Sequence, residues 1–455
     1  MTASDATSSL RYRASSAISG NQLGLQTSGG WNTSSLDHPR FFVGFLTEPE
    51  QAAQGLLAVA AVARARYHVP MTATRMGSIL DPVVTSDGAN LRFESFSACC
   101  GVYARFDITE RDLDGEVLDR GTTNVDVNQP LQAALSRVRG REPLHLSVGP
   151  DALEVTTLDE AVVERKVPLP QRWLRGFAEA PVALARMTPR GEVTGTEARR
   201  FLRSLPRSDA RSSLWATVTG RSLTLSTRAG RDSVPMSGPQ RLLTLAPLLR
   251  FASTMRVYGP ANDGSPAPSA WELVLPGSRL VLTLSPEVSR GFSGEGGVLE
   301  ALADDTAVSD ADLVADVMGW LPAMTLTEVG VAADLTTDRA EQALAVLGTA
   351  GRVGYDASGG CWFARDLPYD AGDAEALNPR LRSARRLVTE GRLRRDGDLI
   401  VVQVAGNQHH VRGGVGSGPP SCTCHWWARH RGGRGPCSHV LAARMANLLS
   451  APQTA

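Results

Sequence analysis

Four residues near the C-terminus have the types and the spacing of a metal site. Cys422 and Cys424 are separated by one residue, twelve residues follow, and Cys437 and His439 form a second pair with the same separation. Thiolate sulfur and imidazole nitrogen are ligands that Zn²⁺ takes in tetrahedral protein sites. Because four protein ligands leave no open position for a substrate, the pattern predicts a structural zinc.

The local secondary structure should hold each pair of ligands in place. Residues i and i+2 of a strand point to the same face, so we expect Cys422 and Cys424 to reach one ion. Cys437 and His439 precede an apolar helical segment that begins at Val440. The dipole at the start of that helix favours a thiolate. The sequence therefore predicts a strand before one pair and a helix after the other.

Other histidines of this region are alternative ligands. Five of the eight histidines lie between residues 409 and 439. Because four ligands already complete the site, we expect the remaining ones at the surface or beside the ligands, where one could orient a thiolate or contact a phosphate. They are His409, His410, His425 and His430.

Aromatic and basic side chains follow the first cysteine pair. Of Trp426 and Trp427, we expect one to cover the metal as part of a small core, which leaves Trp427 as the candidate for stacking on unpaired bases. Arg429, Arg431 and Arg434 lie in the same glycine-bearing segment and are candidates for phosphate contact. A solvated loop explains these three arginines equally well.

The pattern Cys-x-Cys, a variable gap and Cys-x-His resembles that of SWIM zinc fingers, bacterial type. The expected strand at 399–404 and the helix from Val440 also match, so the resemblance covers about residues 385–450. It implies zinc binding and a role in binding DNA or protein. Bacterial relatives are often encoded beside AAA+ ATPases, so the resemblance also implies a partner ATPase. The ligand positions fall on Cys422, Cys424, Cys437 and His439.

Charge is distributed unevenly along a chain that is neutral overall. Residues 380–455 contain twelve arginines and three acidic residues, a net charge of +9, so the rest of the chain carries −9. Lysine occurs once, at Lys166, and this preference for arginine is most simply a coding bias. A basic C-terminal module on an acidic body nevertheless suggests an anionic partner for the module.

Motifs of enzymes are missing from the sequence. The single lysine has no glycine-rich loop before it, so a Walker A loop is excluded. His-Glu-x-x-His and Gly-x-Ser-x-Gly are also absent. We therefore expect no catalytic residues and no enzymatic activity, and any ATP-driven step would come from a partner.

The N-terminal composition and the cysteines indicate a cytoplasmic protein. The N-terminus lacks the basic and apolar regions of a secretory signal, and the longest apolar stretch, 55–63, is too short to span a membrane. Outside the zinc set, Cys99 and Cys100 are adjacent and Cys361 stands alone, which does not suit a disulfide framework. We expect no membrane association.

The first 295 residues divide into an arm and a body. Residues 1–40 are rich in Ser, Thr, Gly and Asn and predict an irregular arm. Residues 41–295 predict an α+β body with repeated hairpins. A buried helix is expected at 49–66, and helical stretches between the hairpins are expected at 130–138, 170–178, 196–204 and 239–251. A helix followed by paired strands resembles the repeat of a sliding clamp. The hairpins are expected at 82–93, 144–155, 214–225 and 271–282.

The rest of the chain predicts two smaller units in a multidomain α+β protein. Residues 300–368 should form three helices and a hairpin, the order of a winged helix. Acidic residues at the start of the third helix, from Thr337, would repel phosphate, which favours packing or partner docking over base reading by Arg339 and Gln342. Residues 367–379 predict a linker, and 380–450 the SWIM-type zinc finger.

Two functions of different classes fit these observations. One is a zinc protein that binds DNA or other nucleic acid through its basic C-terminal module. The other is a protein–protein adaptor in a complex with a partner ATPase. Zinc binding is common to both.

Overall fold

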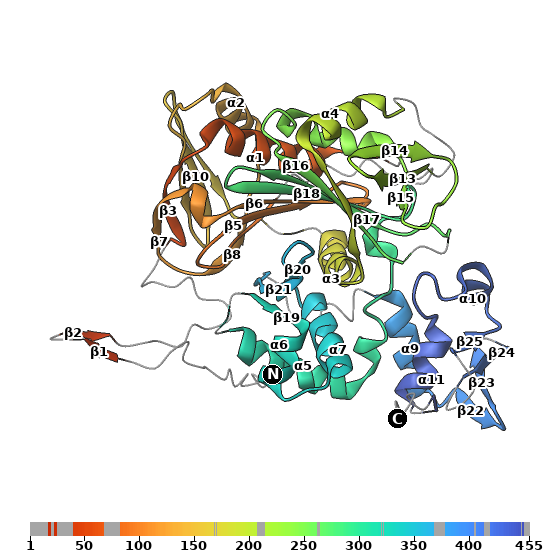
Figure 1. Cartoon of the computed structure of the whole chain (residues 1–455). Helices are drawn as coiled ribbons and strands as arrows, with labels where there is room; N and C mark the ends of the chain where they lie inside the picture. The colour runs from red at the N-terminus through yellow and green to blue at the C-terminus, as the bar shows by residue number, and fades with distance from the viewer. Residues whose placement is uncertain are drawn as a thin grey trace.

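The computed structural model describes residues 40–67, 82–167, 169, 171–206, 214–261, 264–319, 321, 323–367, 378–404, 406–413, 419–446 and 448–449, and the strands β1 (Ala17–Ser19) and β2 (Gln22–Gly24). Helix and sheet are mixed along the chain, as expected for the α+β class (Figure 1). β1 and β2 pair as a hairpin inside the predicted irregular arm. The other residues of that arm up to 39, and linker residues 368–377, lie outside the described residues.

An antiparallel sheet of eight strands forms the centre of the body (Figure 1). A five-stranded and a three-stranded antiparallel sheet flank it. In spatial order the large sheet contains β12 (Thr188–Thr194), β16 (Thr254–Gly259), β17 (Ser269–Leu275), β18 (Ser278–Leu284), β6 (Val102–Ile108), β5 (Leu91–Phe96), β4 (Val83–Ser86) and β8 (Gly121–Asn124). The five-stranded sheet contains β11 (Ala161–Arg165), β10 (Ala152–Thr156), β9 (His145–Val148), β3 (Phe42–Leu46) and β7 (Leu113–Val117). The small sheet contains β14 (Ser222–Ser226), β13 (Leu214–Thr219) and β15 (Val234–Met236).

All four expected hairpins form: β4–β5, β9–β10, β13–β14 and β17–β18. Their turns contain glycine where the backbone needs a positive φ, as at Gly88 (φ 94°) and Gly277 (φ 66°). Turn chemistry was therefore sufficient to locate these strand pairs from the sequence.

The expected helical stretches of the body also form. α1 (Pro49–Arg64), α2 (Gln129–Arg137) and α4 (Gly195–Ser204) lie where they were predicted. α3 (Gln171–Ala185) begins where it was predicted but continues beyond the expected end at residue 178. The helical stretch expected at 239–251 forms as a 3₁₀ helix, η2 (Pro239–Leu248). Pro247 lies inside this segment and has no N–H to donate to the preceding turn, which disfavours a regular α-helix. Short 3₁₀ turns also occur at η1 (Glu110–Asp112) and η3 (Phe292–Gly294).

The two faces of the large sheet are covered differently. On one face α1 packs closely, and Gly55 of α1 lies against the ring of Phe106 on β6. On the opposite face α3 covers Phe96 and Tyr103 through a cluster of aromatic rings, including that of Phe177. Because successive strand residues alternate between faces, the charged residues of β5 and β6 share this second face.

Residues 298–367, here called the helical part, contain three α-helices and a three-stranded sheet. Its elements are η4 (Ala301–Ala303), α5 (Asp305–Met318), β19 (Ala323–Thr325), α6 (Leu326–Ala333), α7 (Thr337–Thr349), β20 (Val353–Asp356) and β21 (Cys361–Ala364). A capping box formed by Thr325 and Glu328 begins α6. The strand β19 was not predicted, and the winged-helix assignment stays a prediction.

The third helix of this part, α7, is largely buried. It packs between α5 and α3, and Arg339 makes a bidentate pair with Asp310 of α5 at 2.6 and 2.8 Å. Gln342 is partly buried. The pair with Asp310 engages Arg339, one of the two candidates for base reading, and the burial of α7 is consistent with a packing role.

The zinc module, residues 378–449, follows as a sheet and three helices. Its elements are α9 (Pro379–Thr389), β22 (Leu393–Asp396), β23 (Leu399–Val404), β24 (Asn407–Arg412), β25 (Ser421–Cys422), α10 (His425–His430) and α11 (Ser438–Met445). Two residues from the start of the helical part, Leu299 and Ala303, belong instead to the hydrophobic core of the module. Their neighbours Val298 and Ala301 belong to the core of the helical part. Among the described helices of the whole chain, none has the length and apolar character needed to cross a membrane.

Candidate metal centre

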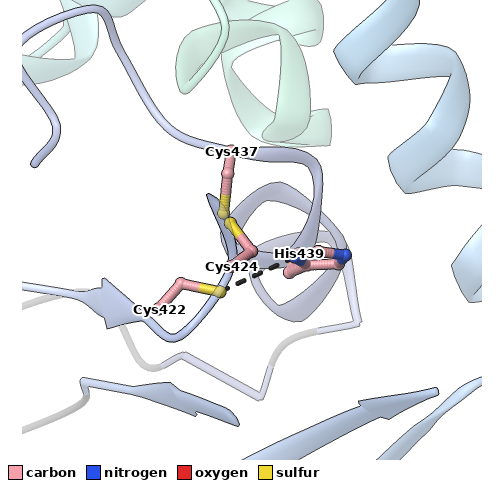
Figure 2. Close-up of side chains that lie close together, drawn as sticks. All are labelled: Cys422, Cys424, Cys437 and His439. Atoms are coloured by element: carbon pink, nitrogen blue, oxygen red, sulfur yellow. Dashed lines mark hydrogen bonds between the residues drawn. The ribbon is translucent and has the colours of Figure 1, made fainter. Parts of the chain in front are cut away.

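The four predicted ligands lie together in the folded chain (Figure 2). One ligand atom from each of Cys422, Cys424, Cys437 and His439 lies within 4.8 Å of the others, and all four residues are buried. No second group of three or more such residues occurs in the described part of the chain. Three sulfurs and one nitrogen that converge on a buried point suit zinc.

The protonation chemistry of the cluster favours a cation. Hydrogen bonds with Cys422 and Cys437 lower the pKa of the Cys424 thiol, because they stabilise its thiolate. Burial lowers the pKa of His439, but hydrogen bonds with Cys424 and Cys437 outweigh burial and raise it to about 9. The same hydrogen bonds act in the opposite direction on Cys422 and raise its pKa, so this thiol keeps its proton. Cys424 therefore contributes a buried thiolate, and a bound divalent cation would displace the protons that remain on the cluster.

Each ligand pair is positioned by the start of a helix. Cys437 is the N-cap of α11, and His439 lies in the first turn, as predicted. Cys424 was expected on a strand, but β25 ends at Cys422 and Cys424 is the N-cap of α10. Its Sγ accepts a hydrogen bond from the Trp427 backbone at 3.4 Å. The backbone of Cys424 is still extended (φ −76°, ψ 160°), so the two-residue spacing brings both sulfurs to one side.

One alternative histidine lies against a ligand, and the two tryptophans lie against the core of the module. The ring of His409 stacks on that of His439, with their centroids 4.4 Å apart. None of the four alternative histidines belongs to the described metal-ligand cluster. Trp426 and Trp427 are both partly buried against the core of the module, so both cover it to some degree.

The three arginines proposed from the sequence have different surroundings. Arg429 lies on α10, Arg431 ends that helix with a left-handed backbone (φ 45°), and both are exposed. Arg434 is partly buried, and its Nη2 donates to the Gly294 carbonyl oxygen at 2.8 Å. Nothing near Arg434 in the sequence indicates this contact, because Gly294 lies 140 residues earlier.

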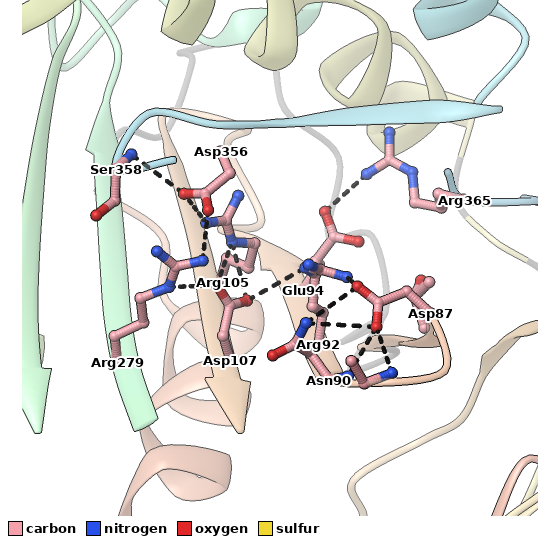
Figure 3. Close-up of polar contacts among 12 residues, drawn as sticks. Asp87, Asn90, Arg92, Glu94, Arg105, Asp107, Arg279, Asp356, Ser358 and Arg365 are labelled. Atoms are coloured by element: carbon pink, nitrogen blue, oxygen red, sulfur yellow. Dashed lines mark hydrogen bonds and ion pairs between the residues drawn. The ribbon is translucent and has the colours of Figure 1, made fainter. Parts of the chain in front are cut away.

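A second polar cluster joins the large sheet to the hairpin β20–β21 (Figure 3). Arg105 and Arg279 contact Asp356 of the hairpin at 3.0 and 2.6 Å. Burial raises the pKa of Asp356, but the two arginines outweigh burial and hold the pKa well below its usual value. Arg365, which follows β21, pairs with Glu94 of β5 at 2.7 Å, and both side chains are inaccessible to solvent. Sequence reasoning missed this cluster, whose charges are paired across the junction and serve packing.

Three solved structures share a low similarity with this chain. Proliferating cellular nuclear antigen (PCNA) from Entamoeba histolytica is 11% identical with a TM-score of 0.36, over 54% of this chain and 98% of that chain. A. fulgidus PCNA with the C-terminal region of FEN-1 bound gives 10% identity and a TM-score of 0.34, over 54% and 97%. The PCNA2–PCNA3 complex from Sulfolobus tokodaii gives 10% and 0.36, over 53% and 98%. Similarity at this level carries no argument about function, and the sliding-clamp analogy stays an analogy.

The match to a protein-family model lies in the C-terminal module. No curated protein is significantly similar to the chain. The family model of the SWIM zinc finger matches residues 401–443, which include all four proposed ligands. Together with the buried Cys/His cluster, this match supports Zn²⁺ as the cofactor. The chain therefore carries a SWIM zinc finger, as expected of a SWIM zinc-finger family protein.

Proposed function

We propose that the zinc module binds DNA or another nucleic acid through its exposed arginines, and that bound zinc maintains the fold that presents them. In this proposal the protein binds nucleic acid and catalyses no reaction. We also propose that it acts in the cytoplasm. Phosphate contacts of arginine would supply affinity, and Trp427 beside Arg429 and Arg431 is the candidate for stacking on a base.

The observation that supports this proposal is the exposure of the basic residues. Nine of the twelve arginines of the module are exposed, whereas its only acidic residues are Glu390, Asp396 and Asp398. Two of those acids pair with neighbouring arginines, Arg392 and Arg394. The exposed arginines are Arg382, Arg385, Arg386, Arg392, Arg394, Arg395, Arg412, Arg429 and Arg431.

Replacing Arg429 and Arg431 by glutamine is expected to weaken nucleic-acid binding. If each makes one phosphate contact, the slope of log K against log salt should fall by about 2. Filter binding of single-stranded and duplex DNA and RNA across a salt series measures this slope. The matched control replaces two exposed arginines of the body, Arg228 and Arg231, and should leave the slope unchanged. Native protein with no affinity at low salt, or with no salt slope, contradicts the proposal.

A second candidate function, protein–protein adaptor, is favoured by the acidity of the helical part. Residues 300–350 contain ten acidic residues and one basic residue, a net charge of −9. Such a surface repels phosphate, so the three helices and hairpin in winged-helix order would dock a protein in preference to DNA. The partner ATPase implied by the SWIM resemblance is one candidate.

The outward face of α5 is the candidate docking surface for that partner. Asp305, Asp312 and Asp316 are exposed and recur at helical spacing. Val308 (45% exposed) and Leu313 (51% exposed) flank this row on either side. A row of carboxylates with aliphatic neighbours suits a partner surface that combines basic and apolar residues.

Replacing Asp305, Asp312 and Asp316 together by asparagine is expected to abolish capture of the protein partner. Neutral side chains of similar shape remove the charge attraction while they preserve the helix. Quantitative pull-down from native lysate with the full chain measures the loss. The control replaces exposed aspartates of the body, Asp114 and Asp151, and should capture the partner normally. Absence of any stable partner, or a partner retained by the triple variant, counts against the adaptor.

A further inference from the structure

The loop between the two ligand pairs is also the surface by which the zinc module contacts the rest of the protein. This interligand loop, residues 425–436, begins directly after Cys424 and ends directly before Cys437, so a metal ligand flanks it on each side. It lies against residues 290–303, here called the docking segment, through contacts of side chains and backbone. The same residues therefore connect metal binding to the position of the module.

Polar contacts fix the loop on the docking segment. Arg434 donates to the Gly294 carbonyl at 2.8 Å and lies 3.6 Å from the Glu295 carboxylate. In the opposite direction, Arg290 donates from its Nη2 to the Gly433 carbonyl at 2.8 Å. Arg290 also pairs with Glu295 through two bonds of 2.6 Å, so one carboxylate orders both arginines.

Arg380, at the start of α9 in the zinc module, bonds to both the interligand loop and the docking segment. Its guanidinium donates to the carbonyls of Glu295 (2.6 Å), Arg434 (2.7 Å) and Pro436 (3.1 Å). The same guanidinium lies over the ring of Trp426, 4.4 Å from the centroid. The guanidinium keeps its hydrogen bonds to the loop carbonyls and its contact with the aromatic ring only while the loop keeps this conformation.

A contact between two glycines brings the two backbones together. Gly435 has a positive φ of 73°, and a methyl group at this position would overlap the carbonyl oxygen of Gly296. On its other side the docking segment is held by α3, because Glu179 accepts a hydrogen bond from the Gly297 backbone at 2.8 Å. The docking segment is therefore also held by α3, which contains no metal ligand. The conformation of the interligand loop, in contrast, depends on the metal ligands at its two ends.

We propose that the metal centre acts as a latch that holds the zinc module against the body. Bound zinc fixes Cys424 to Cys437 and so sets the shape in which the loop presents Arg434 and Gly435. Without the metal, the loop loses the constraint at both ends and the docking contacts separate. Metal occupancy therefore controls the position of the module, whatever partner the module binds.

Hydrogen–deuterium exchange of the docking segment in the full-length protein tests the latch. Removal of zinc by a chelator should make backbone amides in residues 290–303 exchange on the order of tenfold faster, and restored zinc should restore protection. Gly435→Ala should give the same faster exchange while elemental analysis still finds one zinc per chain. Gly391→Ala is the matched control, because Gly391 has a similar positive φ (64°) but open space around its Cα.

Two outcomes overturn the latch. Unchanged exchange of residues 290–303 after complete zinc removal would show that docking does not depend on the metal. Equal deprotection by Gly391→Ala would show that backbone strain in the module, and not the Gly435–Gly296 contact, opens the junction. Faster exchange in the metal-free protein and in zinc-loaded Gly435→Ala, with Gly391→Ala unchanged, supports it.

Discussion

Replacing Cys437 by serine is expected to remove the bound zinc and unfold the zinc module. Cys437 is 1% exposed and belongs both to the ligand cluster and to the hydrophobic core of the module. A structural zinc contributes on the order of 10 kcal/mol of folding free energy in small domains, which is as large as the stability of a typical domain. Elemental analysis should find zinc lost, and circular dichroism should show loss of ordered structure.

Cys361→Ser provides the control for this experiment. Cys361 is also a cysteine outside any disulfide, but it lies on β21 in the helical part, away from the cluster. This variant should keep one zinc per chain. A Cys437→Ser protein that retains stoichiometric zinc and a folded module, or a native protein purified aerobically without chelators that contains no zinc, contradicts the site.

Replacing Arg365 by methionine is expected to destabilise the protein by about 3–5 kcal/mol. The substitution leaves the carboxylate of Glu94 in the interior with its cationic partner removed, and both side chains are wholly buried in the native protein. The hydroxyl of Tyr103 donates to the same carboxylate at 2.5 Å but carries no positive charge. Urea denaturation followed by circular dichroism measures the change in the free energy of unfolding.

A double variant distinguishes the buried charge from the packing of the side chain. Adding Glu94→Gln to Arg365→Met removes the uncompensated charge, so it should recover a large part of the lost stability. A double variant that is less stable than Arg365→Met alone would contradict this explanation. An Arg365→Met protein as stable as the native chain would show that the pair contributes nothing to the junction.

The metal site could be predicted from the sequence because its chemistry is encoded locally. Two ligand pairs with the same spacing, followed by a helix, need no knowledge of distant residues. The hairpins were predictable for the same reason, since the turn residues lie between the strands that they join.

Contacts between distant segments could not be predicted in this way. Glu94 and Arg365 are 271 residues apart in the chain, and nothing near either residue indicates the other. Arg434 was a candidate for phosphate contact because the loop is basic, yet it is engaged by Gly294 and Glu295 of the docking segment. Charge in the sequence indicated which residues are ionic, but only the fold decides whether each charge faces solvent or another part of the chain.

The division of residues 298–303 between two cores limits where this protein can be cut. Val298 and Ala301 pack with the helical part, whereas Leu299 and Ala303 pack with the zinc module. An expression fragment that begins at residue 378 contains every metal ligand but lacks two apolar side chains of its own interior. A fragment meant to fold by itself must therefore be longer than the zinc finger that the sequence motif defines. It needs residues 298–303 as well, or polar substitutions at the apolar positions of the module that these residues cover in the full chain.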